Sequence, residues 1–488
     1  MLHRFLSIVF LVTSLAMVGC GGGGGGGGGA SPAPEVPPAD DPEDGEDFQD
    51  QPVIGVLQPV VLQSGGAQST SVPASPVYAT PTSYHIGYNA RPSGTFSDAG
   101  NRNGIALREG TSDDVSSASD VVAYLENQVL PYDSYSGLVK FNNPPVVQIE
   151  GSATEKQRKL TEFAVKIVNT ALPHDKRLRI ASDYAYEAEG RIGVTFSAEP
   201  PPESDGKYNL GTASANFWYV DEVDPDTQLY RVAEAGAIWG KVTIYTSGFT
   251  GEFDSDRYKV AVLIHEILHA MGMLGHIPSS QFPNSVLTDT LVQLDGDSFL
   301  FEGIDRHALF AAYDRLPTGL QPSELTVESL GSWSSSSAHL LGEFQVRGGT
   351  ARFGAAFANG LPQPWAYGPK PSQDLANNEA ISGTVAWSGA LVGYTPDEAK
   401  IVGEARLDIA LQSLDGRLEF TDLEDFEGNR WDDGDLRYTV EVESNFFTRT
   451  GGDAGTVQGA FVGSGHEGMV GVLERQDLAA GFGGRRGQ

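Results

Sequence analysis

The chain has 488 residues, more than a single hydrophobic core usually fills, so two folded domains joined by linkers are expected. Its 64 acidic and 32 basic residues give a formal net charge of -32. Phosphate backbones need clustered Lys and Arg, so this balance argues against nucleic acid as a partner and suits a solvated surface outside the cytoplasm. The only cysteine is Cys20, so no disulfide can form within one chain.

Residues 1–19 have the features of a targeting segment. Arg4 supplies a positive charge, and Phe5 to Val18 form an apolar stretch too short for a stable membrane span, followed directly by Gly19 and Cys20. The pattern resembles a bacterial lipoprotein signal. That resemblance implies cleavage before Cys20, a lipid on this cysteine and an anchor in the bacterial cell envelope, at the outer membrane or cell surface. An ordinary secretory signal with an incidental cysteine is the alternative.

Residues 20–76 are successively rich in Gly, in Pro with acidic residues, and in Gln, Ser and Pro. Such a composition cannot bury enough apolar surface to fold, so it predicts a flexible tether. Residues 77–150 contain aromatic and branched side chains but no motif. They are interpreted either as an extension of the first domain or as a propeptide.

Residues 151–318 carry the pattern of a mixed α and β domain. Apolar residues at helical spacing predict a helix from Glu155 to Leu172. Strand character follows at Leu178 to Ile180, Arg191 to Phe196 and Ala237 to Tyr245. A second helix is predicted from about Asp256 to Met271, with Asp254 or Ser255 as its N-cap, and its apolar residues on nearly all sides predict that it is buried.

This second helix contains His265, Glu266 and His269. Residues four apart project from the same side of a helix, so both imidazoles can bind one metal ion while Glu266 reaches a water on it. Two histidines and a glutamate are costly to bury in an apolar helix unless something satisfies them, and a metal ion would do so. The alternative is a chance match, with both histidines simply hydrogen-bonded in the core.

Gly272 follows three residues after His269, where a left-handed backbone can end the helix and turn the chain back. The combined pattern resembles the metzincin metallopeptidases, such as matrixins and serralysins. That resemblance implies Zn²⁺ held by His265, His269 and His276, with Glu266 as general base. Here His276 stands one position later than the family's third histidine, which predicts a turn longer by one residue. The alternative is that His276 is a surface residue and that another group or water provides the third metal ligand.

The resemblance implies two further features. The family's methionine turn has no methionine here, so Leu287 in Ser285 to Leu287 is expected to fill its place, before a closing helix from Ile304 to Tyr313. The implied activity is a zinc metalloendopeptidase acting on protein or peptide substrates, with Glu266 activating a zinc-bound water. The substrate is expected to pair with an exposed edge strand at Ala237 to Ser247, unless this apolar strand is internal.

Residues 329–488 alternate apolar and polar side chains between glycine-bearing turns, as at 404–411 and 437–442. This pattern predicts an antiparallel sheet closed into a barrel. Three segments, 383–389, 402–405 and 459–486, resemble the C-terminal barrel of transferrin-binding protein B-like surface lipoproteins, which implies a protein ligand for the barrel. The expected fold class is therefore an α+β metzincin-like peptidase domain plus an all-β antiparallel barrel domain. The alternative function is a surface lipoprotein that binds a host or environmental protein through the barrel, with a degenerate peptidase domain.

Overall fold

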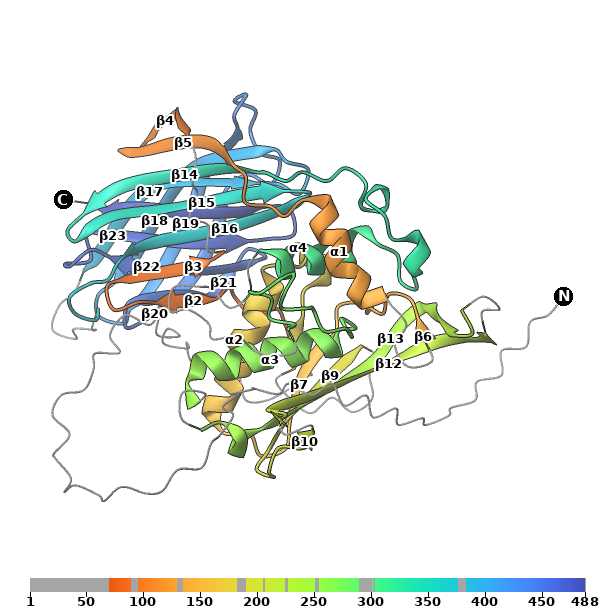
Figure 1. Ribbon diagram of the computed structural model, residues 1–488. Helices are drawn as coiled ribbons and strands as arrows, with labels where there is room; N and C mark the ends of the chain where they lie inside the picture. The colour runs from red at the N-terminus through yellow and green to blue at the C-terminus, as the bar shows by residue number, and fades with distance from the viewer. Residues whose placement is uncertain are drawn as a thin grey trace, which may run out of the picture.

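The computed structural model describes residues 70–88, 95–129, 135–181, 190–204, 207–223, 227–250, 254–288, 301, 303–375 and 383–487. These residues form a mixed seven-stranded sheet, an antiparallel seven-stranded sheet, a short two-stranded pair and a closed eight-stranded barrel (Figure 1). Within these ranges, no helix has both the length and the apolar character needed to cross a bilayer. Cys20, the signal segment and most of the predicted tether lie outside the described residues.

The first sheet contains the strands that lie nearest to the His-Glu-His helix. Its strands are β1 (Thr70–Ser71), β6 (Tyr135–Ser136), β7 (Val146–Glu150), β8 (Arg179–Ala181), β9 (Arg191–Ser197), β12 (Gly211–Val223) and β13 (Tyr230–Tyr245). The order is β1-β8-β7-β9-β13-β12, and β6 pairs beside β13. Strands β8, β7, β9 and β13 are parallel, whereas β12 is antiparallel to β13 and forms one edge. A separate short pair consists of β10 (Glu203–Ser204) and β11 (Lys207–Tyr208).

Two long helices, α2 (Glu155–Asn169) and α3 (Asp256–Ala270), contact each other, and α3 also lies against β12 and β13. Helix α2 begins with a capping box, in which Thr154 and Gln157 exchange side-chain and backbone hydrogen bonds. Helix α3 begins at the N-cap Ser255, whose hydroxyl accepts from the Tyr258 N–H. Both predicted helices are confirmed within a few residues of their expected ends, and α3 is buried from Arg257 to Ala270 except at Lys259.

The remaining helical elements connect the sheets. They are α1 (Ala118–Val129), α4 (Ile304–Phe310), a π-helical turn (Ala311–Arg315) and four short 3-10 turns (His174–Lys176, Thr246–Gly248, Pro322–Glu324 and Glu328–Leu330). Helices α1 and α4 pack against each other, although they are far apart in the sequence. The predicted closing helix from Ile304 to Tyr313 is thus present as α4 and the first part of the π-helical turn.

The second sheet combines two distant parts of the chain. Its strands are β2 (Val77–Ala79), β3 (Ser83–Gly87), β4 (Phe96–Arg102), β5 (Ile105–Ser112), β14 (Ser337–Val346), β15 (Gly349–Ala358) and β16 (Leu361–Pro369). Their order is β2-β3-β16-β15-β14-β5-β4, so strands before residue 113 flank strands after residue 336 on both sides. Strands β2 to β5, which lie in the range 77–150 for which the sequence left an extension or a propeptide open, are therefore part of this sheet.

The barrel closes because β17 pairs with both β18 and β24. Its strands are β17 (Thr384–Tyr394), β18 (Lys400–Ala410), β19 (Asp415–Asp425), β20 (Leu436–Glu443), β21 (Phe446–Gly452), β22 (Thr456–Val462), β23 (Gly468–Glu474) and β24 (Ala479–Arg486). The predicted antiparallel closed barrel is confirmed, but it begins at Thr384 and not near residue 329. The strands between 337 and 369 find their partners in β3 and β5, so they are not available to the barrel.

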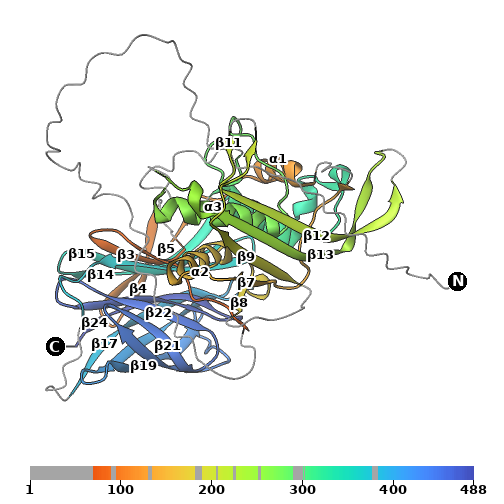
Figure 2. The same cartoon turned by 90° about the horizontal axis from the view of Figure 1, so that it is seen from below.

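The barrel and the mixed sheet are joined through the second sheet and through direct contacts. Figure 2 shows the second sheet between the barrel and α2. Gln363 of β16 donates to the carbonyl of Thr170 at the end of α2, over 3.3 Å. Arg177, just before β8, and Glu474, the last residue of β23, form an ion pair of 2.7 Å. Both side chains are less than a tenth exposed. A buried charge pair between the two halves ties their positions together.

Candidate metal centre

His265 and His269 lie one turn apart on the buried helix α3, and both side chains are almost fully shielded from solvent. The Nδ1 atom of His265 lies 2.6 Å from the carbonyl oxygen of Val286, and Nδ1 of His269 lies 2.5 Å from that of Met273. A carbonyl oxygen can only accept, so each Nδ1 carries the hydrogen and donates it. Each Nε2 of the neutral rings is therefore left with an exposed lone pair, as a metal ligand requires.

The two Nε2 atoms face each other across 2.9 Å. Two lone pairs at this distance repel each other unless a proton or a cation lies between them. Burial lowers the pKa of His265 to about 3, helped by the neighbouring His276, and burial together with both other histidines lowers the pKa of His269 well below its usual range. The rings therefore stay unprotonated near neutral pH, and a shared metal ion is the cation that this geometry can accept.

The third histidine reaches the same place through a tight turn after α3. Gly272 has φ +104°, and a Cβ there would lie 2.3 Å from the carbonyl oxygen of Val139, so only glycine fits. The ring of His276 lies 5.3 Å from that of His265 and 5.1 Å from that of His269. One nitrogen from each of the three rings falls within 4.8 Å of the other two. The longer turn predicted from the sequence thus brings His276 beside the helix pair.

The size of this cluster suits one ion. Two nitrogens bound tetrahedrally to zinc at about 2.1 Å lie about 3.4 Å apart. The distances among the three histidines bracket that value, from the 2.9 Å between the helix pair to the 4.8 Å limit. Imidazole sets suit Zn²⁺ and several other divalent transition metals. The donor set therefore fits Zn²⁺ and supplies three of the four ligands of a tetrahedral site.

Glu266 is fully buried beside this cluster. Neither of its carboxylate oxygens has a hydrogen-bond partner among the described residues. Burial raises the pKa of this carboxyl well above its usual range. A buried carboxyl without a partner costs several kcal/mol, on the order of ~2–5, so its presence in an apolar helix calls for a chemical role. A nearby cation would favour its ionised form.

The first residue of the edge strand β12 lies directly against this carboxyl. A Cβ built on Gly211 would come within 2.6 Å of Cγ and Oε1 of Glu266, so a side chain at this position would collide with the glutamate. Glycine at position 211 therefore allows the backbone of β12 to approach the carboxyl group closely. Among the described strands, β12 pairs only with β13, so the edge strand of the sheet and the candidate base are neighbours.

The expected substrate strand needs a correction at this point. Ala237 to Ser247 falls mainly in β13, which pairs with β9 on one side and with β12 on the other. It is therefore internal and has no free edge, as the alternative interpretation held. Strand β13 is internal because β12 forms a hairpin with it and covers its outer side. The edge next to Glu266 belongs to β12.

The segment from Ser285 to Leu287 lies in contact with His265 and with the residue after His276. The Val286 carbonyl accepts the hydrogen of His265, and Leu287 is fully buried, with its carbonyl accepting from the Ile277 N–H over 2.9 Å. Leu287 thus fills an apolar position under the turn that leads from His276. The segment therefore contacts the side chain of His265 and the backbone of Ile277, the residue after His276.

Asp305 of α4 holds this segment in place, which the sequence did not indicate. Its carboxylate accepts from the Ser285 hydroxyl at 2.5 Å, from the Val286 N–H at 2.8 Å and from the Tyr124 hydroxyl at 2.5 Å. Burial raises the pKa of Asp305 to about 6, although these three hydrogen bonds lower it. The aspartate therefore anchors the backbone that orients His265.

Gln128, at the end of α1, is the second residue that sequence reasoning missed. It forms a pair of hydrogen bonds with the backbone of Gly275, the residue before His276. The sequence signal nearest to Gln128 was indirect: the apolar side chains in residues 121–125 indicated that this segment could be ordered. Nothing in a single sequence pairs Gln128 with a glycine 147 positions away.

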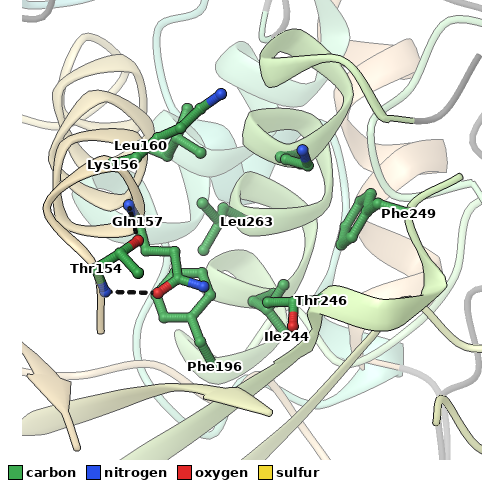
Figure 3. Close-up of a pocket in the computed structure, with 10 residues that line it drawn as sticks. Thr154, Lys156, Gln157, Leu160, Phe196, Ile244, Thr246, Phe249 and Leu263 are labelled. Atoms are coloured by element: carbon green, nitrogen blue, oxygen red, sulfur yellow. Dashed lines mark hydrogen bonds between the residues drawn. The ribbon is translucent and has the colours of Figure 1, made fainter. Parts of the chain in front are cut away.

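A small apolar pocket lies on the opposite side of α3. It has a volume of about 160 Å³, and Figure 3 shows Leu263 between side chains of α2 and the sheet. Leu160, Phe196, Ile244 and Phe249 contribute its apolar wall. Leu263 and His265 are two residues apart and so point to opposite sides of the helix. The pocket is therefore separate from the histidine cluster.

Comparison with known proteins gave only distant structural likeness. No family model matches the chain, and no curated protein matches it. Solved structures that it resembles include the isotype 1 transferrin binding protein B of serogroup B Neisseria meningitidis, at 16% identity and a TM-score of 0.23, covering 31% of this chain and 33% of that one. A variant of the same antigen from Haemophilus parasuis has 12% identity and a TM-score of 0.22, covering 31% and 36%.

A further solved structure, described as a surface lipoprotein, has 12% identity and a TM-score of 0.20, covering 30% of this chain and 77% of that one. The chain thus spans about a third of the length of the transferrin binding proteins that it matches. The evidence that this chain contains a closed barrel is the pairing of its own strands, and not its likeness to these structures.

Proposed function

We propose that this chain is a zinc-dependent endopeptidase that hydrolyses protein or peptide substrates at the bacterial cell envelope. The observation that carries the proposal is the convergence of His265, His269 and His276 beside the buried, unpartnered carboxyl of Glu266. The three imidazoles would hold Zn²⁺ in a metzincin-like peptidase half. A lipid on Cys20 would anchor the chain to the membrane, at the outer membrane or cell surface.

Bound Zn²⁺ supplies a Lewis acid that activates water and polarises a carbonyl group. The Glu266 carboxylate would take a proton from the attacking water and deliver it to the amine that leaves when the C–N bond breaks. The hydrogen bonds from His265 and His269 to backbone carbonyls fix both rings with Nε2 directed at the site. The buried surroundings exclude bulk water and strengthen each of these charge interactions.

The edge strand β12 supports an endopeptidase in particular. Its backbone begins beside Glu266 and pairs only with β13 among the described strands. An extended peptide could therefore add to the sheet as a further strand and present a peptide bond to the carboxylate. Backbone pairing of this kind does not need a free chain terminus, which is the requirement for cleavage within a polypeptide.

The proposal is tested with the full chain, by measuring its zinc content and its cleavage of casein. We expect the wild type to hold one zinc per chain and to cleave, and Glu266→Ala to keep the zinc and lose cleavage by several orders of magnitude, on the order of ~10³-fold. Glu162→Ala, on α2, is the matched control and should cleave as the wild type does. A wild type that binds no zinc would overturn the proposal.

The second candidate is a surface lipoprotein that binds a host or environmental protein through its barrel, with a degenerate peptidase half. The observation in its favour is the filled barrel interior, where large side chains such as Trp387, Phe420, Phe461 and Phe482 form one apolar core. Side chains fill the interior of an eight-stranded barrel of this kind, so a protein partner would meet its outer surface. A zinc-loaded wild type that is as inert as Glu266→Ala on casein and on broad peptide libraries would favour this candidate.

A further inference from the structure

Large apolar side chains that face solvent are concentrated in one part of the described structure. Four of the six such side chains lie on the β12–β13 hairpin, namely Tyr219, Val220, Val223 and Trp239, each more than a third exposed. Figure 1 shows the far part of this hairpin projecting as a two-stranded arm away from α2 and α3. A concentration of exposed apolar side chains on one element commonly marks a binding surface. The arm is therefore a candidate for contact with another molecule.

An aromatic cluster gives this arm a defined shape. The ring of Tyr135 lies 5.3 Å from Phe217, 5.2 Å from Tyr219 and 5.8 Å from Tyr230, and the last two rings lie 5.4 Å apart. Strand β6, which carries Tyr135, also pairs with β13 at Tyr230. A two-stranded ribbon alone is only marginally stable in water, so these contacts are needed to hold it. The apolar side chains are thus presented on a supported element.

Strand β12 runs from the candidate metal centre to this arm, and its pairing with β13 has register irregularities between Asn216 and Val223. It starts at Gly211, beside Glu266, and ends at Val223, a length of about 40 Å at the rise of an extended strand. Tyr219 and Val223 stand eight and twelve positions beyond Gly211. Along its outer side, β12 pairs with no other strand in the described part of the chain. One extended polypeptide could follow the whole edge.

We infer that the arm, formed by residues 217–223 of β12 and 230–239 of β13, is an accessory binding surface for the substrate polypeptide. The inference rests on the proposed peptidase function and names its substrate class. The substrates are unfolded or extended polypeptides with apolar residues about eight to twelve positions from the cleaved bond, matching the offsets of Tyr219 and Val223 from Gly211. A compact folded protein cannot lie along a strand edge of this length. Short peptides would reach the metal centre but not the arm.

Binding is measured first, with fluorescein-labelled casein as an unfolded, apolar probe and with the zinc-loaded full chain carrying Glu266→Gln to prevent cleavage. The arm variant combines Val220→Ser, Val223→Ser and Trp239→Ser, and it leaves the aromatic cluster that supports the arm unchanged. Removing three half-exposed apolar contacts should raise the Kd for casein about tenfold. The control combines Val327→Ser and Phe426→Ser, which are equally exposed but lie elsewhere, and should leave the Kd unchanged.

Cleavage is measured second, on a casein bond that the wild type cuts. A peptide of about eight residues across that bond is compared with one extended by about twelve residues on each side. The arm variant should lower kcat/KM for the long peptide about tenfold, through KM, and leave the short peptide unchanged. An equal loss of kcat/KM on both peptides would show that the arm is only a structural element and would overturn the inference. An unchanged Kd for casein in the arm variant would overturn it as well.

Two further outcomes separate this inference from the proposed function. A wild type that binds casein through the arm but cuts nothing would refute the peptidase and leave the binding surface standing. Analytical ultracentrifugation tests the other occupant, a second copy of the chain pairing along β12. A wild-type dimer that becomes a monomer in the arm variant would assign the surface to self-association and overturn the inference.

Discussion

Gln128 and Gly275 are joined by two hydrogen bonds: the side-chain Nε2 donates to the Gly275 carbonyl over 3.0 Å, and the Gly275 N–H donates to Oε1 over 2.9 Å. A Cβ on Gly275 would lie 1.8 Å from the carbonyl oxygen of Asn127, so the glycine is needed for this close approach. The end of α1 therefore fixes the backbone immediately before His276. Gly275 belongs to the lengthened turn, and it is the residue that α1 holds through Gln128.

Gln128→Ala should loosen this turn and weaken zinc binding about tenfold or more, because His276 would no longer be held toward the other two rings. The measurement is competition for zinc against a chromophoric chelator, with the d–d spectrum of the Co²⁺ form as a second readout of coordination. Glu126→Ala, an exposed position on the same helix, is the control. Equal zinc affinity and an unaltered Co²⁺ spectrum in Gln128→Ala would show that the two hydrogen bonds do not position the histidine.

His276→Ala should lower zinc affinity more strongly than Gln128→Ala, by about a hundredfold or more, because it removes a donor and not only its support. His174→Ala is the matched control, since this histidine lies on an exposed 3-10 turn outside the cluster. Zinc content after dialysis against a weak chelator is the readout. Unchanged content in His276→Ala would assign the third ligand to another group.

Asp305 should make stability depend on pH between about 4 and 6. Its folded pKa is raised to about 6 from an ordinary 3.8. In this window the folded protein keeps the proton that the unfolded chain releases, so the free energy of unfolding falls as pH rises and levels off above about pH 6. The full difference is on the order of ~3 kcal/mol.

Asp305→Asn should remove this dependence. The comparison is the urea midpoint of the metal-free wild type and of Asp305→Asn at pH 4.5 and pH 7, with the exposed Asp120→Asn on α1 as control. The difference between wild type and Asp305→Asn isolates Asp305 from the other titrating groups. A difference that does not change between the two pH values would contradict the prediction.

Glu474→Ala should destabilise the contact between the mixed sheet and the barrel. The substitution leaves Arg177, only 9% exposed at its side chain, without its charge partner, and it also removes the acceptor of the Ser75 hydroxyl. Breaking one member of a buried pair costs about 3–5 kcal/mol. Differential scanning calorimetry should show a lower unfolding temperature or two separated transitions. Arg406→Ala, from an exposed pair on the barrel, should have little effect. Identical traces for Glu474→Ala and Arg406→Ala would rule out this role for the ion pair.

Local sequence signals determined those features that depend on neighbouring residues. The spacing of His265 and His269 places both imidazoles on one side of any helix, Ser255 marks where that helix starts, and Gly272 marks where it turns back. The alternation in residues 404–411 and 437–442 determined strands with one buried face. Each of these follows from the period or the conformational range of a few consecutive residues.

Tertiary structure alone decided which distant segments meet. The sequence placed the substrate strand at β13, yet β12 folds over it and becomes the edge. The barrel begins at Thr384 because the strands before it pair with residues 83–87 and 105–112, far earlier in the chain. Gln128 and Asp305 reach the histidine cluster only after α1 and α4 pack together. A single sequence records no pairing between such positions, because their contacts arise from the folding of the whole chain and not from local periodicity.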